Sequence, residues 1–151
     1  MKKLPLRSIF LRTVAIAFFF TSFLAVASKV GVDSYEIYLN NKLLLRQSLS
    51  DPLNLNTLPI SEANAGDNLV IRYVQCNAPG KTGRNRSIVL RDAEGKLVKE
   101  WKFDNAEGSN TAMVIPVKEM LAVRKNASSE LNLYYVADGL SAGQKLAALK
   151  S

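Results

Sequence analysis

Basic side chains gather in one turn-rich segment, residues 77–86 (NAPGKTGRNR), which also holds two glycines. Lys81, Arg84 and Arg86 lie in this segment, and Arg72 lies on the predicted strand before it. Glycine-rich turns let backbone N–H groups converge on an anion, and guanidinium groups bind a carboxylate or a phosphate at two points. The pattern therefore predicts a binding loop for an acidic glycan, a phosphate or an acidic protein surface. The alternative is an ordinary solvated loop between two strands.

The single cysteine, Cys76, directly follows a predicted strand at residues 68–75. If Leu69, Ile71 and Tyr73 face the core, Cys76 points outward near the basic loop. Nearby cations favour the thiolate form of a cysteine and raise its reactivity, so Cys76 is a candidate reactive thiol. Without a second cysteine it can form no internal disulfide, and the alternative is a small apolar side chain at the end of a strand.

Histidine is absent from the chain. Its absence excludes His-ligated metal sites and catalytic arrangements of the Ser-His-Asp or Cys-His kind. The carboxylates show no spacing that pairs two of them and no dense Asp/Asn run of the calcium-binding type. We therefore predict no catalytic residue, no metal site and no cofactor, with a two-carboxylate hydrolase as the alternative. The scattered carboxylates include Glu36, Asp67, Asp92, Glu94, Glu100, Asp104 and Glu107.

Four aromatic residues, Tyr38, Trp101, Tyr134 and Tyr135, are candidates for a surface that stacks on sugars or binds a protein. We expect Trp101 to anchor the core instead, because large aromatic side chains dominate core packing. Tyr134 and Tyr135 are adjacent and must point to opposite faces of a strand, which leaves one of them free to be exposed.

The first 27 residues have the pattern of a secretory signal peptide. Four basic residues precede an uncharged apolar run at 13–27, which ends in the small-x-small sequence Ala25-Val26-Ala27. This pattern predicts a cleaved leader at 1–27 and a single domain at 28–151, with an uncleaved anchor helix as the alternative. The protein is then periplasmic or secreted, and it keeps no stable membrane span after cleavage.

The charge of the chain falls when the leader is set aside. The formal net charge is +7, but four of the 20 basic residues and none of the 13 acidic residues lie in the leader. The remaining excess of basic residues is small and argues against nucleic acid as a partner, since nucleic-acid binding needs a concentrated basic face.

Short β-forming stretches recur along the rest of the chain, separated by turns rich in Gly, Pro, Asn and Asp. Residues 33–47 predict a hairpin, because Asn40-Asn41 supplies two residues that tolerate the positive φ of a tight turn. Further strands are predicted at residues 68–75, 87–92, 96–103, 111–115 and 129–136.

Pro116 opens a predicted short helix that runs to Lys125. The tail predicts either a helix capped at Ser141 or an edge strand at 146–149. With about seven short strands, the pattern indicates an all-β protein, an antiparallel β-sandwich that is immunoglobulin-like or similar, with one short helix.

These features favour an exported, non-enzymatic domain that binds a protein or an anionic glycan of the envelope or matrix through its basic loop. One alternative is a secreted enzyme that depends on the Cys76 thiol or on carboxylates. Another is a subunit of a surface assembly in which edge strands pair between chains. The ligand, the strand order and the oligomeric state stay open at this level.

Overall fold

A computed structural model of the protein describes residues 31–52, 57–106 and 111–149. All of them belong to one compact unit, Gly31–Ser151. The predicted leader at 1–27 lies outside the described residues, as does the carboxylate Glu107. Within the described part of the chain, no helix is both long and apolar enough to cross a membrane.

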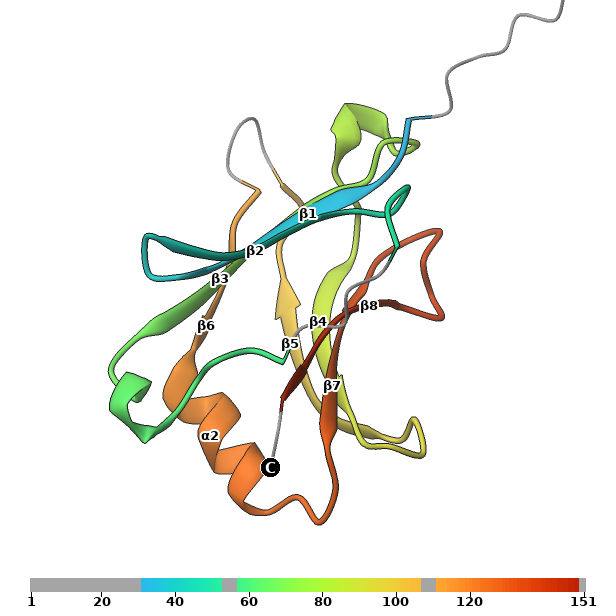
Figure 1. Ribbon diagram of the computed structural model, residues 1–151. Helices are drawn as coiled ribbons and strands as arrows, with labels where there is room; N and C mark the ends of the chain where they lie inside the picture. The colour runs from blue at the N-terminus through green and yellow to red at the C-terminus, as the bar shows by residue number, and fades with distance from the viewer. Residues whose placement is uncertain (1–30, 53–56, 107–110, 150–151) are drawn as a thin grey trace, which may run out of the picture. The chain divides into compact units, whose positions relative to one another are not determined.

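In the described residues, eight strands form two four-stranded antiparallel sheets that pack face to face (Figure 1). The predicted antiparallel sandwich is therefore confirmed, with one strand more than expected. Sheet A has the order β2 (Lys42–Ser48), β1 (Ser34–Leu39), β3 (Asn68–Val74), β6 (Met113–Pro116). Sheet B has the order β5 (Leu97–Phe103), β4 (Arg86–Arg91), β7 (Leu131–Val136), β8 (Gln144–Leu149).

The predicted hairpin is the pair β1 and β2. Asn40 adopts φ +52° in its turn, the left-handed conformation that a two-residue hairpin loop requires. The Asn40 side chain donates a hydrogen bond to Asp67 (2.8 Å) and accepts one from the backbone N–H of Asn68 (2.9 Å). The turn is thereby fixed to the start of β3, the neighbouring strand.

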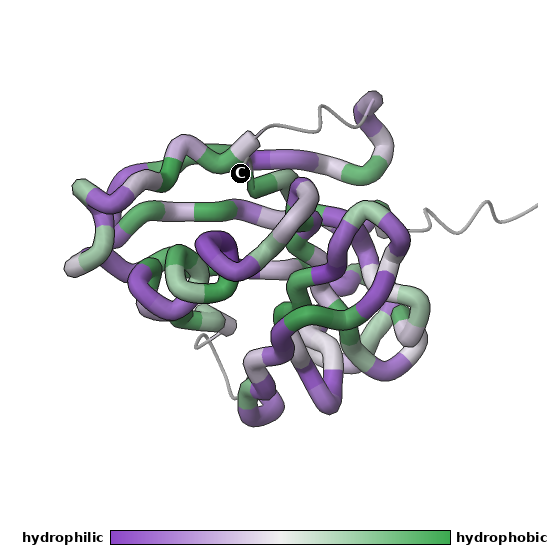
Figure 2. The backbone as a smooth tube through the Cα atoms, turned by 90° about the horizontal axis from the view of Figure 1, so that it is seen from below, coloured by the Kyte–Doolittle hydropathy of each residue, from purple (hydrophilic) through white to green (hydrophobic). Residues whose placement is uncertain are grey.

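The core lies between the two sheets and consists of alternate residues of each strand. On β3, Leu69, Ile71 and Tyr73 are buried as predicted, while Arg72 and Val74 are exposed. Figure 2 shows hydrophobic and hydrophilic stretches interspersed along the whole backbone. The period of two places one side chain in the core and the next on the outer face.

Three tyrosines stack across the core. Tyr35 and Tyr73 lie opposite each other on β1 and β3, with ring centroids 6.2 Å apart, and Tyr135 of β7 stacks on Tyr73 at 4.0 Å. The Tyr35 hydroxyl donates to the backbone carbonyl of Leu146 on the opposite sheet (2.7 Å). Tyr135 is buried and Tyr134 is half-buried on the other face, as the adjacent pair predicts.

The predicted helix is confirmed as α2 (Val117–Lys125), with Pro116 at its N-cap. Trp101 on β5 packs against the core from its edge, where its indole N–H donates to the carboxylate of Glu119 on α2 (2.7 Å). Trp101 is only partly buried, so it anchors the junction of β5 and α2 rather than the centre of the core. The buried face of α2 consists of Val117, Met120 and Leu121.

The tail forms a strand, so the second of the two predicted alternatives is correct. β8 pairs with β7, and the isolated bridge between Thr57 and Ala148 places another segment beside it. Leu146, Ala147, Ala148 and Leu149 are all buried.

The stacked tyrosines give a matched test of hydrogen bonding in the core. Tyr35→Phe should lower the free energy of unfolding by about 1 kcal/mol, because the carbonyl of Leu146 loses its donor. Tyr135→Phe should change it by less than about 0.5 kcal/mol, because the buried Tyr135 hydroxyl has no well-aligned hydrogen-bond partner among the described residues and only a weak contact with the backbone N–H of Gly83. Urea denaturation followed by circular dichroism measures both; equal losses in the two variants would contradict the assignment.

Candidate functional site

The basic loop is a folded turn between β3 and β4. The backbone N–H of Gln75 donates to the carbonyl of Lys81 (3.0 Å), and that of Lys81 donates to the carbonyl of Ala78 (2.9 Å). Gly80 and Lys81 adopt φ values of +68° and +58°, so the chain reverses here through two left-handed residues. These bonds hold the loop in one conformation and leave the Lys81 side chain exposed.

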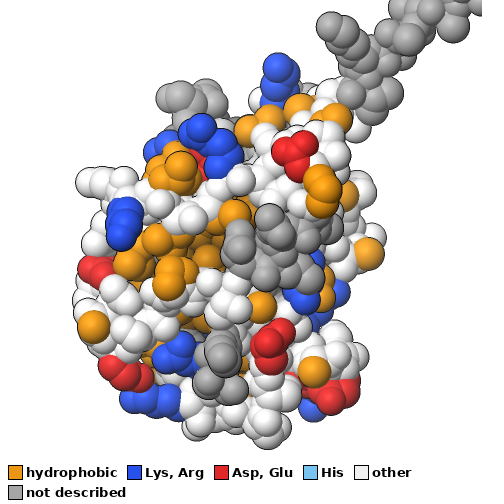
Figure 3. Space-filling view, in the orientation of Figure 1, with side chains coloured by type: hydrophobic (Ala, Val, Ile, Leu, Met, Phe, Trp, Pro, Cys, Tyr) orange, Lys and Arg blue, Asp and Glu red, His pale blue; other side chains and the backbone are white. Residues whose placement is uncertain are grey.

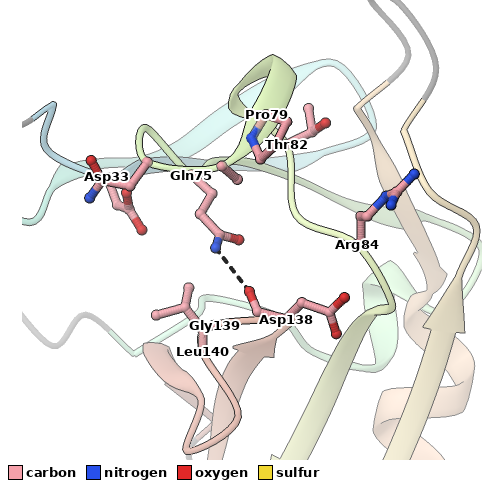
Figure 4. Close-up of a pocket in the computed structure, with 10 residues that line it drawn as sticks. Asp33, Gln75, Pro79, Thr82, Arg84, Asp138, Gly139 and Leu140 are labelled. Atoms are coloured by element: carbon pink, nitrogen blue, oxygen red, sulfur yellow. Dashed lines mark hydrogen bonds between the residues drawn. The ribbon is translucent and has the colours of Figure 1, made fainter.

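This loop and the loop after β7 enclose a pocket of about 450 Å³ at one end of the sandwich. Figure 4 shows Asp33 and Arg84 on opposite sides of the pocket, with Gln75 between them and Asp138 below. Thr82 also lines the pocket. The residues come from three separate parts of the chain, so only the folded sandwich assembles them.

Gln75 connects the two loops. Its side chain is buried, and its amide nitrogen donates to the backbone carbonyl of Asp138 (3.0 Å). Because a carbonyl can only accept a hydrogen bond, the nitrogen end of the Gln75 amide must face Asp138. The backbone N–H of Asp138 in turn donates to the carbonyl of Arg84 (2.9 Å). The pocket walls are thus held together by direct bonds.

Both acidic groups of the pocket are already bound by donors of the protein. Asp33 accepts from the Tyr73 hydroxyl (3.0 Å) and from the backbone N–H of Cys76 (2.9 Å). Asp138 accepts from the side-chain amide of Asn85, 3.1 Å from each carboxylate oxygen. By contrast, the side chain of Arg84 makes no ion pair with any described residue. Arg84 is therefore a free guanidinium donor at the edge of the pocket, and Figure 4 shows its side chain pointing outward, away from Asp33 and Gln75.

Arg86 does not belong to the accessible part of this loop. It is 5% exposed, and its guanidinium donates to the backbone carbonyls of Asp104 (2.6 and 3.0 Å) and Thr111 (2.9 Å). The prediction placed it among solvent-exposed binding residues. Its position on β4, with Ile88 and Leu90 on the inward face, explains the difference.

Arg72 lies away from the pocket, on the outer face of sheet A. Its guanidinium lies over the ring of Tyr38, 5.4 Å from the centroid, and it lines a different depression together with Glu36 and Arg46. Of the four predicted binding residues, the structure keeps Lys81 and Arg84 in one exposed loop and separates Arg72 and Arg86 from them.

Cys76 is half-buried, and its thiol lies 3.0 Å from the backbone carbonyl of Val32, to which it can donate. It does not line the pocket beside the basic loop. Its reactivity stays a prediction. Among the described residues, no group of three His, Cys, Asp or Glu side chains could hold a metal ion.

Sequence reasoning missed Gln75 and Asp138. The position of Gln75 could have been predicted, because it continues the alternation of the inward residues Leu69, Ile71 and Tyr73. Its amide is therefore expected on the inward face of the strand. A polar group there needs a bonding partner. Asp138 gave no signal, because its role depends on a contact with a residue 63 positions earlier.

The tyrosines beneath the pocket hold their protons tightly. Burial raises the pKa of Tyr135 to about 12. Burial, followed by the hydrogen bond to Asp33, raises the pKa of Tyr73 above its ordinary value, and burial alone raises that of Tyr35. In each case the apolar surroundings disfavour the charged phenolate.

Stability should therefore fall at alkaline pH. The folded state binds the Tyr135 proton more tightly than the unfolded state. The resulting contribution to the free energy of unfolding is complete below about pH 10 and is lost as the pH rises toward 12. Between these pH values the free energy of unfolding should fall by about 1.4 kcal/mol per pH unit for each such tyrosine. Urea denaturation across this range measures it, and absorbance at alkaline pH should show these tyrosines ionising together with unfolding. A flat profile would contradict the raised pKa values.

Comparison of the chain with protein-family models, curated proteins and solved structures finds no match in any of the three. The function is therefore argued from the geometry of the chain itself.

Proposed function

We propose that the protein is an exported, non-enzymatic binding domain that recognises an anionic group of a protein or of an envelope or matrix glycan. The pocket between the basic loop and the loop after β7 is the proposed site. One observation carries this proposal: Arg84 lines the pocket without a charged partner among the described residues, while Asp33 and Asp138 are each bound by protein donors. The predicted leader at 1–27 is the argument for export.

A carboxylate is the chemistry that this arrangement suits best. The guanidinium of Arg84 offers a planar pair of donors, and charge-assisted bonds of this kind are shorter and stronger than neutral ones. Lys81 adds a second exposed cation on the same loop. The loop is already folded by its own hydrogen bonds, so binding orders little additional chain.

Recognition here depends on directed bonds more than on a broad positive field. The pocket is lined by one cation, Arg84, and by two carboxylates, Asp33 and Asp138, so its lining carries no excess of positive charge. On the face seen in Figure 3, basic and acidic side chains lie in several separate groups. The pocket volume of about 450 Å³ is within the range of small-ligand sites and suits one sugar-sized group or one side chain of a partner.

Titration with glucuronate, followed by amide NMR, tests the proposal. We expect shifts concentrated at residues 75–85 and 138–140, and binding by Arg84→Ala weakened about tenfold or more, because a charge-assisted hydrogen bond contributes about 1.5–3 kcal/mol. Lys118→Ala is the matched control, since it removes an exposed cation from α2, which does not line the pocket. Glucose is the uncharged control ligand. Shifts that persist unchanged in Arg84→Ala, or their complete absence in the wild type, would overturn the proposed site.

A further inference from the structure

One of the two edge strands of sheet B, β5, has a free outer edge among the described residues. In the order β5-β4-β7-β8, no strand of the described residues pairs with its outer side. Such an edge presents unpaired backbone N–H and C=O groups that can add another strand. Leu97 and Val98 at its start are 53% and 42% exposed. Trp101 and Phe103, which pack against the core from this strand, are only partly buried.

The side chains of β5 divide cleanly between its two faces. Lys99, Trp101 and Phe103 pair with the inward residues of β4, whereas Glu100 and Lys102 pair with its outward residues Val89 and Ser87. From Lys99 to Phe103 the pairing with β4 is continuous, because the register shift lies before Lys99. This stretch, KEWKF, is therefore a regular edge with two opposite charges on its outer face.

We propose that two copies of the chain associate by antiparallel pairing of their β5 edges about a twofold axis at Trp101. In this register Glu100 of each copy lies directly opposite Lys102 of the other, which makes two ion pairs on the outer face. On the inner face Lys99 lies opposite the ring of Phe103 of the second copy, and the two Trp101 residues face each other. Opposite charges and cation–aromatic pairs are favourable when they lie directly across neighbouring strands.

Within one copy Lys99 already lies over the ring of its own Trp101, 5.7 Å from the centroid, but Glu100 and Lys102 interact only weakly. The Lys102 ammonium is 3.9 Å from the Glu100 carboxylate along the same strand, and the two side chains are 81% and 34% exposed. An exposed pair at this distance contributes little. Both groups are thus free to bond across a new strand interface without giving up a strong contact.

The other edges of the sandwich do not offer this complementarity. β2 carries only the basic residues Lys42 and Arg46 and is interrupted by a register shift. β6 has four residues, and β8 is bridged by Thr57. Lysines on an edge strand ordinarily deter pairing. On β5 each lysine has a complementary residue in the symmetric register, so the same charges select one arrangement and disfavour others.

The association should be reversible. A single seven-residue edge buries less than the roughly 800 Å² per partner of a standard stable interface. Exposed ion pairs also weaken as salt screens them. We therefore expect a monomer–dimer equilibrium that shifts toward dimer with rising protein concentration and falling ionic strength.

Sedimentation velocity of the purified full-length protein, with charge-exchange variants, tests the proposal. Because of the twofold axis, Glu100→Lys creates two Lys–Lys pairs across the interface, and Lys102→Glu creates two Glu–Glu pairs. Each variant should therefore weaken dimerisation about tenfold. The double exchange Glu100→Lys with Lys102→Glu restores both pairs and should restore the dimer. Lys42→Glu, an equal charge change at an exposed site on β2 of the other sheet, should leave dimerisation unchanged.

A wild-type protein that stays monomeric at the highest soluble concentration would overturn the proposal. So would single variants that dimerise like the wild type, or a double exchange that stays as weak as the single variants. All the altered residues are exposed, and circular dichroism verifies that each variant is folded.

Discussion

Replacement of Gly83 by alanine is expected to lower the free energy of unfolding by about 2–3 kcal/mol, since overpacking a rigid site commonly costs 1–3 kcal/mol. The added methyl group would overlap the hydroxyl of Tyr135 and would lie 2.7 Å from both the Ala137 methyl and the amide oxygen of Gln75. None of these neighbours can move aside easily. Tyr135 is fully buried and stacked on Tyr73, and Gln75 is held by its bond to Asp138.

Gly66→Ala is the matched control for this prediction. A methyl group at Gly66 would meet no atom within 4 Å, and the residue does not need the left-handed conformation. Its stability should stay the same or rise by a few tenths of a kcal/mol, because alanine reduces the freedom of the unfolded chain. Urea denaturation of the two variants measures the difference; similar losses in both would show that crowding at Gly83 is not the cause.

The crowding can also be assigned to one atom. If the Tyr135 hydroxyl is the main obstacle, the double variant Gly83→Ala with Tyr135→Phe should be more stable than Gly83→Ala alone. The two changes would then not be additive, as expected for residues in direct contact. Additive effects would instead indicate that Ala137 or Gln75 resists the methyl group.

Much of the fold follows from local patterns in the sequence. Asn40 and Gly95 mark turns because they adopt positive φ with little or no strain, and the alternation on β3 correctly separates its two faces. Pro116 likewise marks the start of α2. The tail stayed ambiguous because residues 146–149 are buried without alternation, and such a run is compatible with helix or strand until its partner β7 is known.

The site was harder to predict because its bonds join distant parts of the chain. Spacing correctly placed Lys81 and Arg84 together on an exposed turn. It gave Arg86 the same role, since no local pattern shows that carbonyls 18 and 25 residues later surround its guanidinium. Burial of a charge is set by tertiary contacts, whereas a charge cluster in the sequence records only proximity along the chain.

Arg86 gives the second large expected effect. Arg86→Ala should lower the free energy of unfolding by at least about 3 kcal/mol, because one charge-assisted hydrogen bond contributes about 1.5–3 kcal/mol and the change removes three and leaves backbone carbonyls without a donor. Its guanidinium ties the end of β5, through Asp104, to the segment before β6, through Thr111. Arg86→Lys should recover only part of this loss, because a lysine cannot reproduce the planar fork that reaches both carbonyls.

Arg84→Ala is the control that separates the two arginines of this segment. Arg84 is exposed and unpaired among the described residues, so its loss should change stability by less than about 0.5 kcal/mol while it weakens glucuronate binding. Thermal or urea denaturation measures the stability of both variants, and the NMR titration measures binding. If Arg84→Ala destabilised the fold as much as Arg86→Ala, the loop would be a structural element and not a binding site. If Arg86→Ala left stability unchanged, the bonds of Arg86 to the two carbonyls would contribute little to the free energy of unfolding.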